Sequence, residues 1–455
     1  MSRIKLSEHF NYGRLMRFVL PSIIMMVFVS VYGIVDGFFV SNFVGEIPFA
    51  ALNLIFPMIM ILGSVGFMLG TGGNAVVAKA LGEGNTEKAN KIFSMLVYTT
   101  LVVGALLAAV GIAFARPVAK LFAKSETTMS AAEKAELIEH CVQYARVILA
   151  VLPAFMLQNA FQGFFVTAEK PRLGLYVTVA AGCTNMVLDA LFVAVFKWGL
   201  IGAAAATALS QCVGGVLPLL YFARKNDSLL RLGKTRFNGG ELIRVCVNGS
   251  SELMTNISLS LIAILYNAQL MDLVGYVGVS AYGIIQYIGF IFIAVFLGYS
   301  IGVAPIVGYH YGAQNDSELR NIFKKSILIT LTLGIVMTLI AVLFARPFSA
   351  IFTGGNRALL DLTARGMRIN AFGFLLCGFN IFGSAFFTAL GCGGVSLLIS
   401  FSRTLVFQAF SVLVLPKLFG LGIDGIWGAV ILAEGLSLIL TLAMFVIRKH
   451  KYHYI

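Results

Sequence analysis

Four acidic residues lie within long apolar stretches of the sequence and away from their ends: Asp36, Asp189, Glu252 and Glu434. A carboxylate at membrane depth is costly unless a partner compensates for its charge, so such residues usually face a cavity. No Lys or Arg lies within the apolar parts of the stretches that hold Asp36 and Asp189, since Arg172 stands at the very start of the second stretch. If both aspartates share the interior of one helical bundle, a proton, a metal cation or a cationic substrate must meet their charge. These residues therefore favour a cation-dependent site.

Three further residues could complete such a site. Asn185 precedes Asp189 by four positions, so the two side chains share one face of a helix. Thr207 and Tyr32 add hydroxyl oxygens. A site built only from oxygen ligands suits a hard cation such as Na⁺. The same groups could instead hydrogen-bond a protonated carboxyl group, or simply join neighbouring helices.

Amide side chains and a proline stand near these residues. Asn159 and Gln162 lie three positions apart, with Gln158 beside them, and they either line a substrate cavity or bond to neighbouring helices. Pro21 precedes Asp36 by fifteen positions. A proline inside a helix removes one backbone hydrogen bond and allows a bend, whereas at the start of a helix it would mark the membrane face.

The second half of the chain carries a different set of charges. Arg403 lies inside an apolar stretch, and we expect it to pair with Glu252 or Glu434.

The elements that position these residues are predicted membrane helices. The 455-residue chain is 59% hydrophobic and 12% charged, which is too apolar for a soluble domain. Each of its long apolar stretches can cross a hydrocarbon core of roughly 30 Å. The sequence therefore predicts an all-α integral membrane protein with twelve transmembrane helices, at about 18–44, 48–80, 91–115, 138–167, 172–196, 199–222, 242–271, 275–309, 321–345, 362–390, 394–416 and 421–447.

An internal repeat organises these helices into two halves. FARPVAKLF at 114–122 returns as FARPFSAIF at 344–352, and FFVTA at 164–168 resembles FFTAL at 386–390. The repeat predicts two six-helix lobes, residues 1–222 and 241–455, joined by a cytoplasmic linker at 223–240. An even helix count in each lobe makes the lobes parallel, with a pseudo-twofold axis along the membrane normal. We expect the Arg-Pro pairs in the repeat, Arg116-Pro117 and Arg346-Pro347, to end helices.

The net charge of +13 follows this topology. Segments on the side of the two termini hold 21 Lys and Arg residues, and segments on the opposite side hold 11. The positive-inside rule then places both termini in the cytoplasm. Membrane topology explains the positive charge, so we expect no nucleic-acid partner.

The sequence lacks the motifs that would indicate several other classes of function. The sequence contains no GxxxxGK[ST] loop, which would indicate transport driven directly by ATP. It also contains no DDxxD-like cluster, which would bind Mg²⁺ and a diphosphate substrate in an enzyme. The five histidines lie near the ends of the apolar stretches or near the termini, and the six cysteines form no CxxC pair. We therefore expect neither an enzyme nor a cofactor, and we expect the cysteines to be packing residues.

The set of twelve helices in two lobes, with Pro21 and Asp36 on the first helix, Asn185 and Asp189 on the fifth and Thr207 on the sixth, resembles the multidrug and toxic compound extrusion (MATE) family. The resemblance implies a monomeric antiporter of the bacterial cytoplasmic membrane, which exports organic, often cationic, drugs in exchange for Na⁺ or H⁺ by alternating access. It assigns the cation site to Asp36, Asn185, Asp189 and Thr207, the substrate cavity to Tyr32, Asn159 and Gln162, and a conformational bend to Pro21.

The chain departs from some members of that family in its second half. Glu252 falls early in its apolar stretch, and the stretch at 362–390 contains no acidic residue. Both features speak against a second cation site there. A flippase for lipid-linked oligosaccharide or peptidoglycan precursors is an alternative of the same superfamily. Such a cavity needs basic groups for a pyrophosphate, and Arg403 stands alone.

Overall fold

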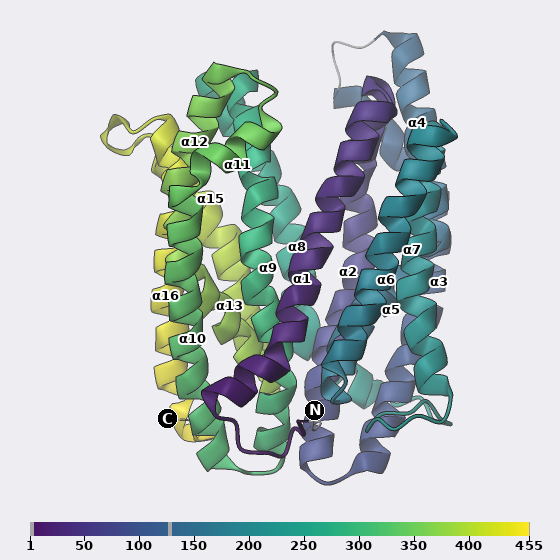
Figure 1. The fold of residues 1–455 in the computed structure, drawn as a ribbon, viewed down its shortest axis with the longest axis vertical. Helices are drawn as coiled ribbons and strands as arrows, with labels where there is room; N and C mark the ends of the chain where they lie inside the picture. Colours follow the sequence, from purple (N-terminus) through teal and green to yellow (C-terminus); the bar gives the residue numbers. More distant parts are fainter. Residues whose placement is uncertain (1–3, 126–129, 455) are drawn as a thin grey trace. The chain divides into compact units, whose positions relative to one another are not determined.

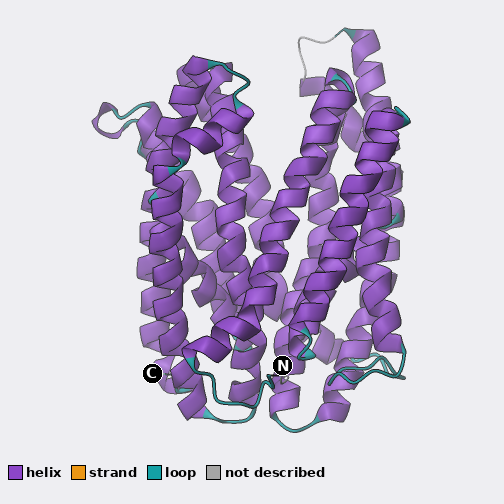
Figure 2. Cartoon of the chain, in the orientation of Figure 1, coloured by secondary structure: helices purple, strands orange, loops and turns teal. Residues whose placement is uncertain are grey.

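The computed structural model describes residues 4–125 and 130–454, and within these ranges the chain forms helices and loops but no strand (Figure 2). Ten helices are long and apolar enough to cross a membrane, or up to twelve if each of two bent helix pairs counts as one span. The predicted all-α membrane fold is confirmed (Figure 1).

The chain forms two compact units. The first unit comprises Phe28–Leu81 and Asn85–Gly249, and the second comprises Met1–Val27, Gly82–Gly84 and Ser250–Ile455. Two long helices, α1 (Tyr12–Phe43) and α8 (Gly239–Val274), contribute residues to both units. The division into lobes at 1–222 and 241–455, joined by a linker at 223–240, remains a prediction from the sequence.

The remaining helices belong to one unit each, apart from the last residue of α2. Those of the first unit are α2 (Glu46–Gly82), α3 (Thr86–Ser125), α4 (Ala131–Ala150), α5 (Leu152–Thr167), α6 (Pro171–Asp189), the π-helical turn η1 (Ala190–Val195) and α7 (Gly199–Ala223). Those of the second are α9 (Tyr276–Gly312), α10 (Asp316–Leu343), α11 (Ala345–Phe352), α12 (Arg357–Ala371), α13 (Phe374–Ala389), α14 (Gly393–Phe401), the π-helical turn η2 (Ser402–Val406), α15 (Phe407–Val414), the short 3₁₀ turn η3 (Leu418–Gly420) and α16 (Ile423–Tyr452).

The two bent pairs occupy equivalent places in the internal repeat. Helices α4 and α5 meet at 54°, and α12 and α13 meet at 51°. Pro153 stands in the first turn of α5, where its missing amide proton is tolerated but prevents continuation of α4. The predicted spans at 138–167 and 362–390 are therefore each broken.

Each unit also contains an aromatic cluster at matching positions of the repeat. In the first unit, the ring of Phe93 lies 4.9 Å from Phe164 and 5.0 Å from Phe222, measured between centroids. In the second unit, Phe323 lies 5.0 Å from Phe386 and 4.9 Å from Phe445. Such edge-to-face and tilted pairs stabilise packing beyond simple contact. The repeat therefore preserves the packing between the third, fourth and sixth predicted helices of each half.

The two Arg-Pro pairs fold differently, which corrects one expectation. Pro117 lies inside α3, which continues to Ser125, so the first pair ends no helix. In the second half, α10 ends at Leu343 and Arg346-Pro347 begins α11. Both arginines form ion pairs: Arg116 Nη2 lies 2.6 Å from Glu139 Oε2, and Arg346 Nη1 lies 3.0 Å from Asp361 Oδ1.

Pro21 lies well inside helix α1, which begins nine residues earlier at Tyr12. The Asn11 side chain accepts a hydrogen bond from the amide of Arg14 at 2.8 Å and caps the helix start. Pro21 therefore does not mark the beginning of the helix, and one backbone hydrogen bond is missing within α1.

The aromatic cluster of the second unit provides a stability test. Phe445 is buried at 3% exposure, and truncation of a buried Phe to Ala typically costs about 3–5 kcal/mol in protein cores. We expect Phe445→Ala to lower the midpoint of thermal unfolding in detergent. Phe114→Ala is the matched control, because Phe114 is 57% exposed. Equal midpoints for the two variants would contradict a structural role of the cluster.

Candidate functional site

The close approach of helices α1 and α6 in the first unit depends on a glycine. A Cβ atom added at Gly182 would lie 2.5 Å from Cε1 of Phe28 and 2.8 Å from Cδ1 of Tyr32. Both distances are too short for any residue with a side chain to fit without a shift of the rings. Gly182, Asn185 and Asp189 follow helical spacing, so they share the face of α6 that meets α1.

This helix face brings the two predicted aspartates together. Asp189 is fully buried, Asp36 is half-buried, and the two carboxyl groups are close enough to interact electrostatically. Among the described residues, no group donates a hydrogen bond to Oδ1 of Asp36 or to either carboxylate oxygen of Asp189, and all three atoms are buried. Within residues 4–125 and 130–454, neither aspartate forms an ion pair with Lys, Arg or His. Two carboxylates of like charge thus lie close together, with buried oxygens that could still accept hydrogen bonds or bind a cation.

The predicted amide and hydroxyl ligands lie beside the aspartates. Asn185 is buried at 1% exposure, and its Nδ2 donates to Oγ1 of Thr207 on α7 at 3.5 Å, which is a long hydrogen bond. Tyr32 interacts electrostatically with Asp36, one helical turn away. The structure therefore brings Asp36, Asn185, Asp189 and Thr207 to one region, with Tyr32 at its edge.

The sequence analysis missed one neighbour of this site. Tyr144 of α4 is buried at 5% exposure and interacts electrostatically with both Asp36 and Asp189. Fifteen tyrosines occur in the chain, and nothing in the local sequence of Tyr144 distinguishes it from the others. Only the packing of α4 against its neighbours places its hydroxyl group here.

The three amide residues of α5 behave differently from one another. Gln158 lies close enough to Tyr32 to interact with it, and its side chain fills the space that a Cβ at Gly214 of α7 would need. Asn159 donates from Nδ2 to the carbonyl of Phe155 in its own helix at 3.0 Å. Gln162 is buried at 8% exposure. Gln158 is thus the amide that the structure connects to the aspartate site, through Tyr32.

A local change of backbone geometry marks the position of Asp189. The α-helix α6 ends at this residue and continues directly as the π-helical turn η1. Turns of this kind are rare and occur frequently at functional sites. The second unit contains a π-helical turn at the corresponding predicted span, and η2 includes Arg403.

Arg403 gives the acidic residues of the second unit a basic partner: it pairs with Glu434 and interacts electrostatically with Glu252. Nε of Arg403 lies 2.8 Å from Oε1 of Glu434, and Nη2 donates to Sγ of Cys377 at 3.2 Å. Asn380 donates to Oε2 of Glu434 at 2.7 Å. The expected ion pair of Arg403 is confirmed, with Glu434 as the partner. A cavity of about 100 Å³ lies beside it, lined in part by Tyr266 and Tyr282, whose rings stack at 4.6 Å.

The donor set of the aspartate site limits the ions that it could hold. The described residues contain no group of three or more His, Cys, Asp and Glu side chains that could bind a metal. The site instead offers two carboxylates, one amide and one hydroxyl. These oxygen donors fit a proton or a hard monovalent cation better than a transition metal.

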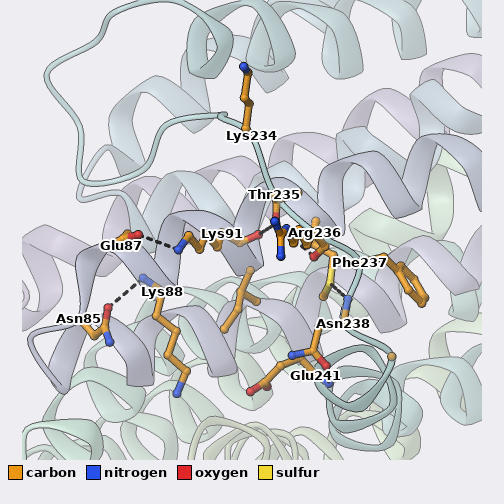
Figure 3. Close-up of a pocket in the computed structure, with 13 residues that line it drawn as sticks. Asn85, Glu87, Lys88, Lys91, Lys234, Thr235, Arg236, Phe237, Asn238 and Glu241 are labelled. Atoms are coloured by element: carbon orange, nitrogen blue, oxygen red, sulfur yellow. Dashed lines mark hydrogen bonds and ion pairs between the residues drawn. The ribbon is translucent and has the colours of Figure 1, made fainter.

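A larger cavity, of about 1,080 Å³, lies elsewhere in the first unit (Figure 3). It is bordered by the start of α3 and by the segment that leads into α8. None of the predicted site residues lines it. Size alone therefore does not identify the functional site, and the unpaired carboxylates are the stronger indication.

Comparisons with known proteins match the chain over nearly its whole length. Multidrug export protein MepA from Staphylococcus haemolyticus is 22% identical over 456 residues, which cover 96% of this chain and 93% of the relative. A crystal structure of MATE in complex with MaL6 matches the fold with a TM-score of 0.89 at 22% identity, and covers 96% of both chains. A MOP superfamily transporter from Pyrococcus furiosus matches with a TM-score of 0.86 at 23% identity over 95% of both chains. For that protein, the reverse polarity of its binding pocket suggests a different function.

The MatE family model matches residues 21–191 and 253–413. The first range contains Pro21 and both aspartates, and the second contains Arg403. This match spans more than half of the sequence, and the chain therefore belongs to the MatE family of multi-pass membrane proteins.

Proposed function

We propose that the protein is a secondary active multidrug efflux transporter of the bacterial cytoplasmic membrane, which exchanges Na⁺ or H⁺ for organic, mostly cationic, compounds. The carrying observation is the pair Asp36 and Asp189: among the described residues, Oδ1 of Asp36 and both carboxylate oxygens of Asp189 are buried without a hydrogen-bond donor. The names of relatives such as multidrug export protein MepA support the choice of cargo.

In this proposal, Asp36, Asn185, Asp189 and Thr207 form the site of the coupling cation. Two adjacent carboxylates without a basic partner repel each other, and a proton or Na⁺ between them removes that repulsion. Asn185 and Thr207 each add an oxygen that can coordinate Na⁺. A bound cation therefore stabilises the closely packed arrangement of α1, α6 and α7.

Coupling requires that cation and cargo favour different states of the protein. Tyr32, Asn159 and Gln162 are proposed to line the substrate cavity. Tyr32 interacts with Asp36, so it connects the two sites directly. A bend at Pro21 would allow α1 to change shape when the cation leaves. Alternating access of a monomer with cytoplasmic termini completes the mechanism.

A flippase for lipid-linked precursors has less support. Binding of a pyrophosphate needs available cationic groups. Arg403 is already engaged by Glu434, and the first unit presents unpaired carboxylates. The acidic site described here favours export of cations.

The first test removes one carboxylate. We expect Asp36→Asn to abolish cation-driven efflux, because a neutral amide no longer attracts the coupling cation. Dye efflux from proteoliposomes with an imposed Na⁺ or H⁺ gradient measures this effect and also identifies the coupling ion. Asp189→Asn should give the same result.

Asp272→Asn is the matched control, because Asp272 is exposed at the end of α8. It should transport at the wild-type rate. Gradient-driven efflux at the wild-type rate by Asp36→Asn, at equal amounts of inserted protein, would refute the proposed coupling site.

The second test moves α1 away from α6 without changing a polar group. Gly182→Ala places a methyl group against Phe28 and Tyr32, and should displace the helix segment that holds Asp36. We expect the apparent affinity for the coupling cation to fall about tenfold, which corresponds to about 1.4 kcal/mol. The concentration dependence of cation-driven efflux gives this affinity.

Gly283→Ala provides the comparison, because no atom lies within 4 Å of an added Cβ at that helical position. It should leave both transport and the unfolding midpoint close to those of the wild type. If both alanine variants keep the wild-type cation dependence, the contact at Gly182 does not position the site.

A further inference from the structure

The large cavity of the first unit has a basic rim that the transport proposal does not use. Lys88 and Lys91 line it from the first turns of α3, and Lys234 and Arg236 line it from the segment before α8 (Figure 3). Its volume of about 1,080 Å³ reaches the range of ligand sites in proteins.

Hydrogen bonds hold the segment before α8 against α3. Oγ1 of Thr235 donates to the carbonyl of Lys91 at 2.9 Å, and the amide of Asn238 lies 3.3 Å from Sδ of Met95. The amide of Gly233 donates to Oγ of Ser94 at 3.0 Å. These anchors fix the backbone on both sides of Arg236, so the rim of the cavity is preformed.

The positive charge of the rim is only partly compensated. The two acidic lining residues are already paired, Glu87 with Lys91 at 2.6 Å and Glu241 with Arg244 at 3.1 Å. Among the described residues, Lys234 and Arg236 form no ion pair, and both are exposed. Two cationic side chains are therefore available to an anion from outside the chain.

The cavity also has an apolar part and lies beside the start of two membrane spans. Phe237 is 72% exposed, and Ile92 and Met95 line the cavity as well. Candidate spans begin at Thr86 and at Gly239, directly next to the lining residues. An exposed apolar ring beside a membrane span can enter the boundary between headgroups and acyl chains. The ligand should then carry both an anionic group and an apolar chain.

We propose that this cavity binds the headgroup of an anionic glycerophospholipid. Lys234 and Arg236 would hold the phosphate oxygens through charge-assisted hydrogen bonds, and Phe237 would lie among the adjoining acyl chains. Basic pockets next to membrane helices bind acidic lipid headgroups by the same physical means. A neutral or zwitterionic lipid lacks the net charge that the rim selects.

The test uses the full chain, purified in detergent and examined by native mass spectrometry. The probes are phosphatidylglycerol and phosphatidylcholine, with inorganic phosphate as a competitor. We expect phosphatidylglycerol to bind in preference to phosphatidylcholine. The double variant Lys234→Gln with Arg236→Gln should bind phosphatidylglycerol about thirtyfold more weakly, since each cation near the surface contributes about 1 kcal/mol.

The matched control removes the same charge from the same segment. Arg224 and Lys225 are exposed and do not line the cavity, so Arg224→Gln with Lys225→Gln should keep wild-type lipid binding. Equal loss in both double variants, or no loss in either, would overturn the proposal. Displacement of phosphatidylglycerol by low millimolar phosphate would also overturn it, because the cavity would then be a site for a free anion. The unfolding midpoint of each variant verifies that the fold is intact.

Discussion

Compensation of charge at membrane depth is the constraint on which this structure depends. The second unit provides a basic residue for this purpose: Arg403 pairs with Glu434 and interacts electrostatically with Glu252, and Asn380 donates a further hydrogen bond to Glu434. In the first unit, no described Lys, Arg or His forms an ion pair with Asp36 or Asp189. A buried pair of carboxylates can persist only if something from outside neutralises it. The two units therefore differ in their polar centres: one contains an ion pair, and the other contains two carboxyl groups with no basic partner among the described residues.

The internal repeat shows which properties the two halves share. Their packing is alike, since Phe93 and Phe323 stand at the centres of corresponding aromatic clusters, and each half contains one sharply bent helix pair. Their chemistry is different, since the π-helical turn of one half follows Asp189 and that of the other contains Arg403. A common framework thus supports two polar centres of opposite character.

Much of the fold and part of the site could be predicted from sequence. Hydropathy located the membrane helices, and the absence of basic residues around Asp36 and Asp189 identified the central pair. Contacts between distant helices left no such signal: the hydroxyl of Tyr144 near the aspartates and the close approach at Gly182 depend on tertiary packing. The Arg-Pro repeat shows the same limit, because α3 continues through Pro117 while α10 ends before Arg346. The same FARP sequence therefore adopts two different local structures, because its surroundings in the two halves differ.

The π-helical turn after Asp189 has a consequence for the rest of its span. An α-helix advances 3.6 residues per turn, and a π-helical turn, with its i→i+5 hydrogen bonds, takes up additional residues. The residues beyond Val195 are therefore rotated about the helix axis relative to a regular continuation of α6. A helical wheel that assumes 3.6 residues per turn through the whole span therefore places the residues after η1 on the wrong face of the helix relative to those of α6. Deletion of a single residue from η1 would restore regular winding and turn Asn185 and Asp189 to a new direction relative to α7.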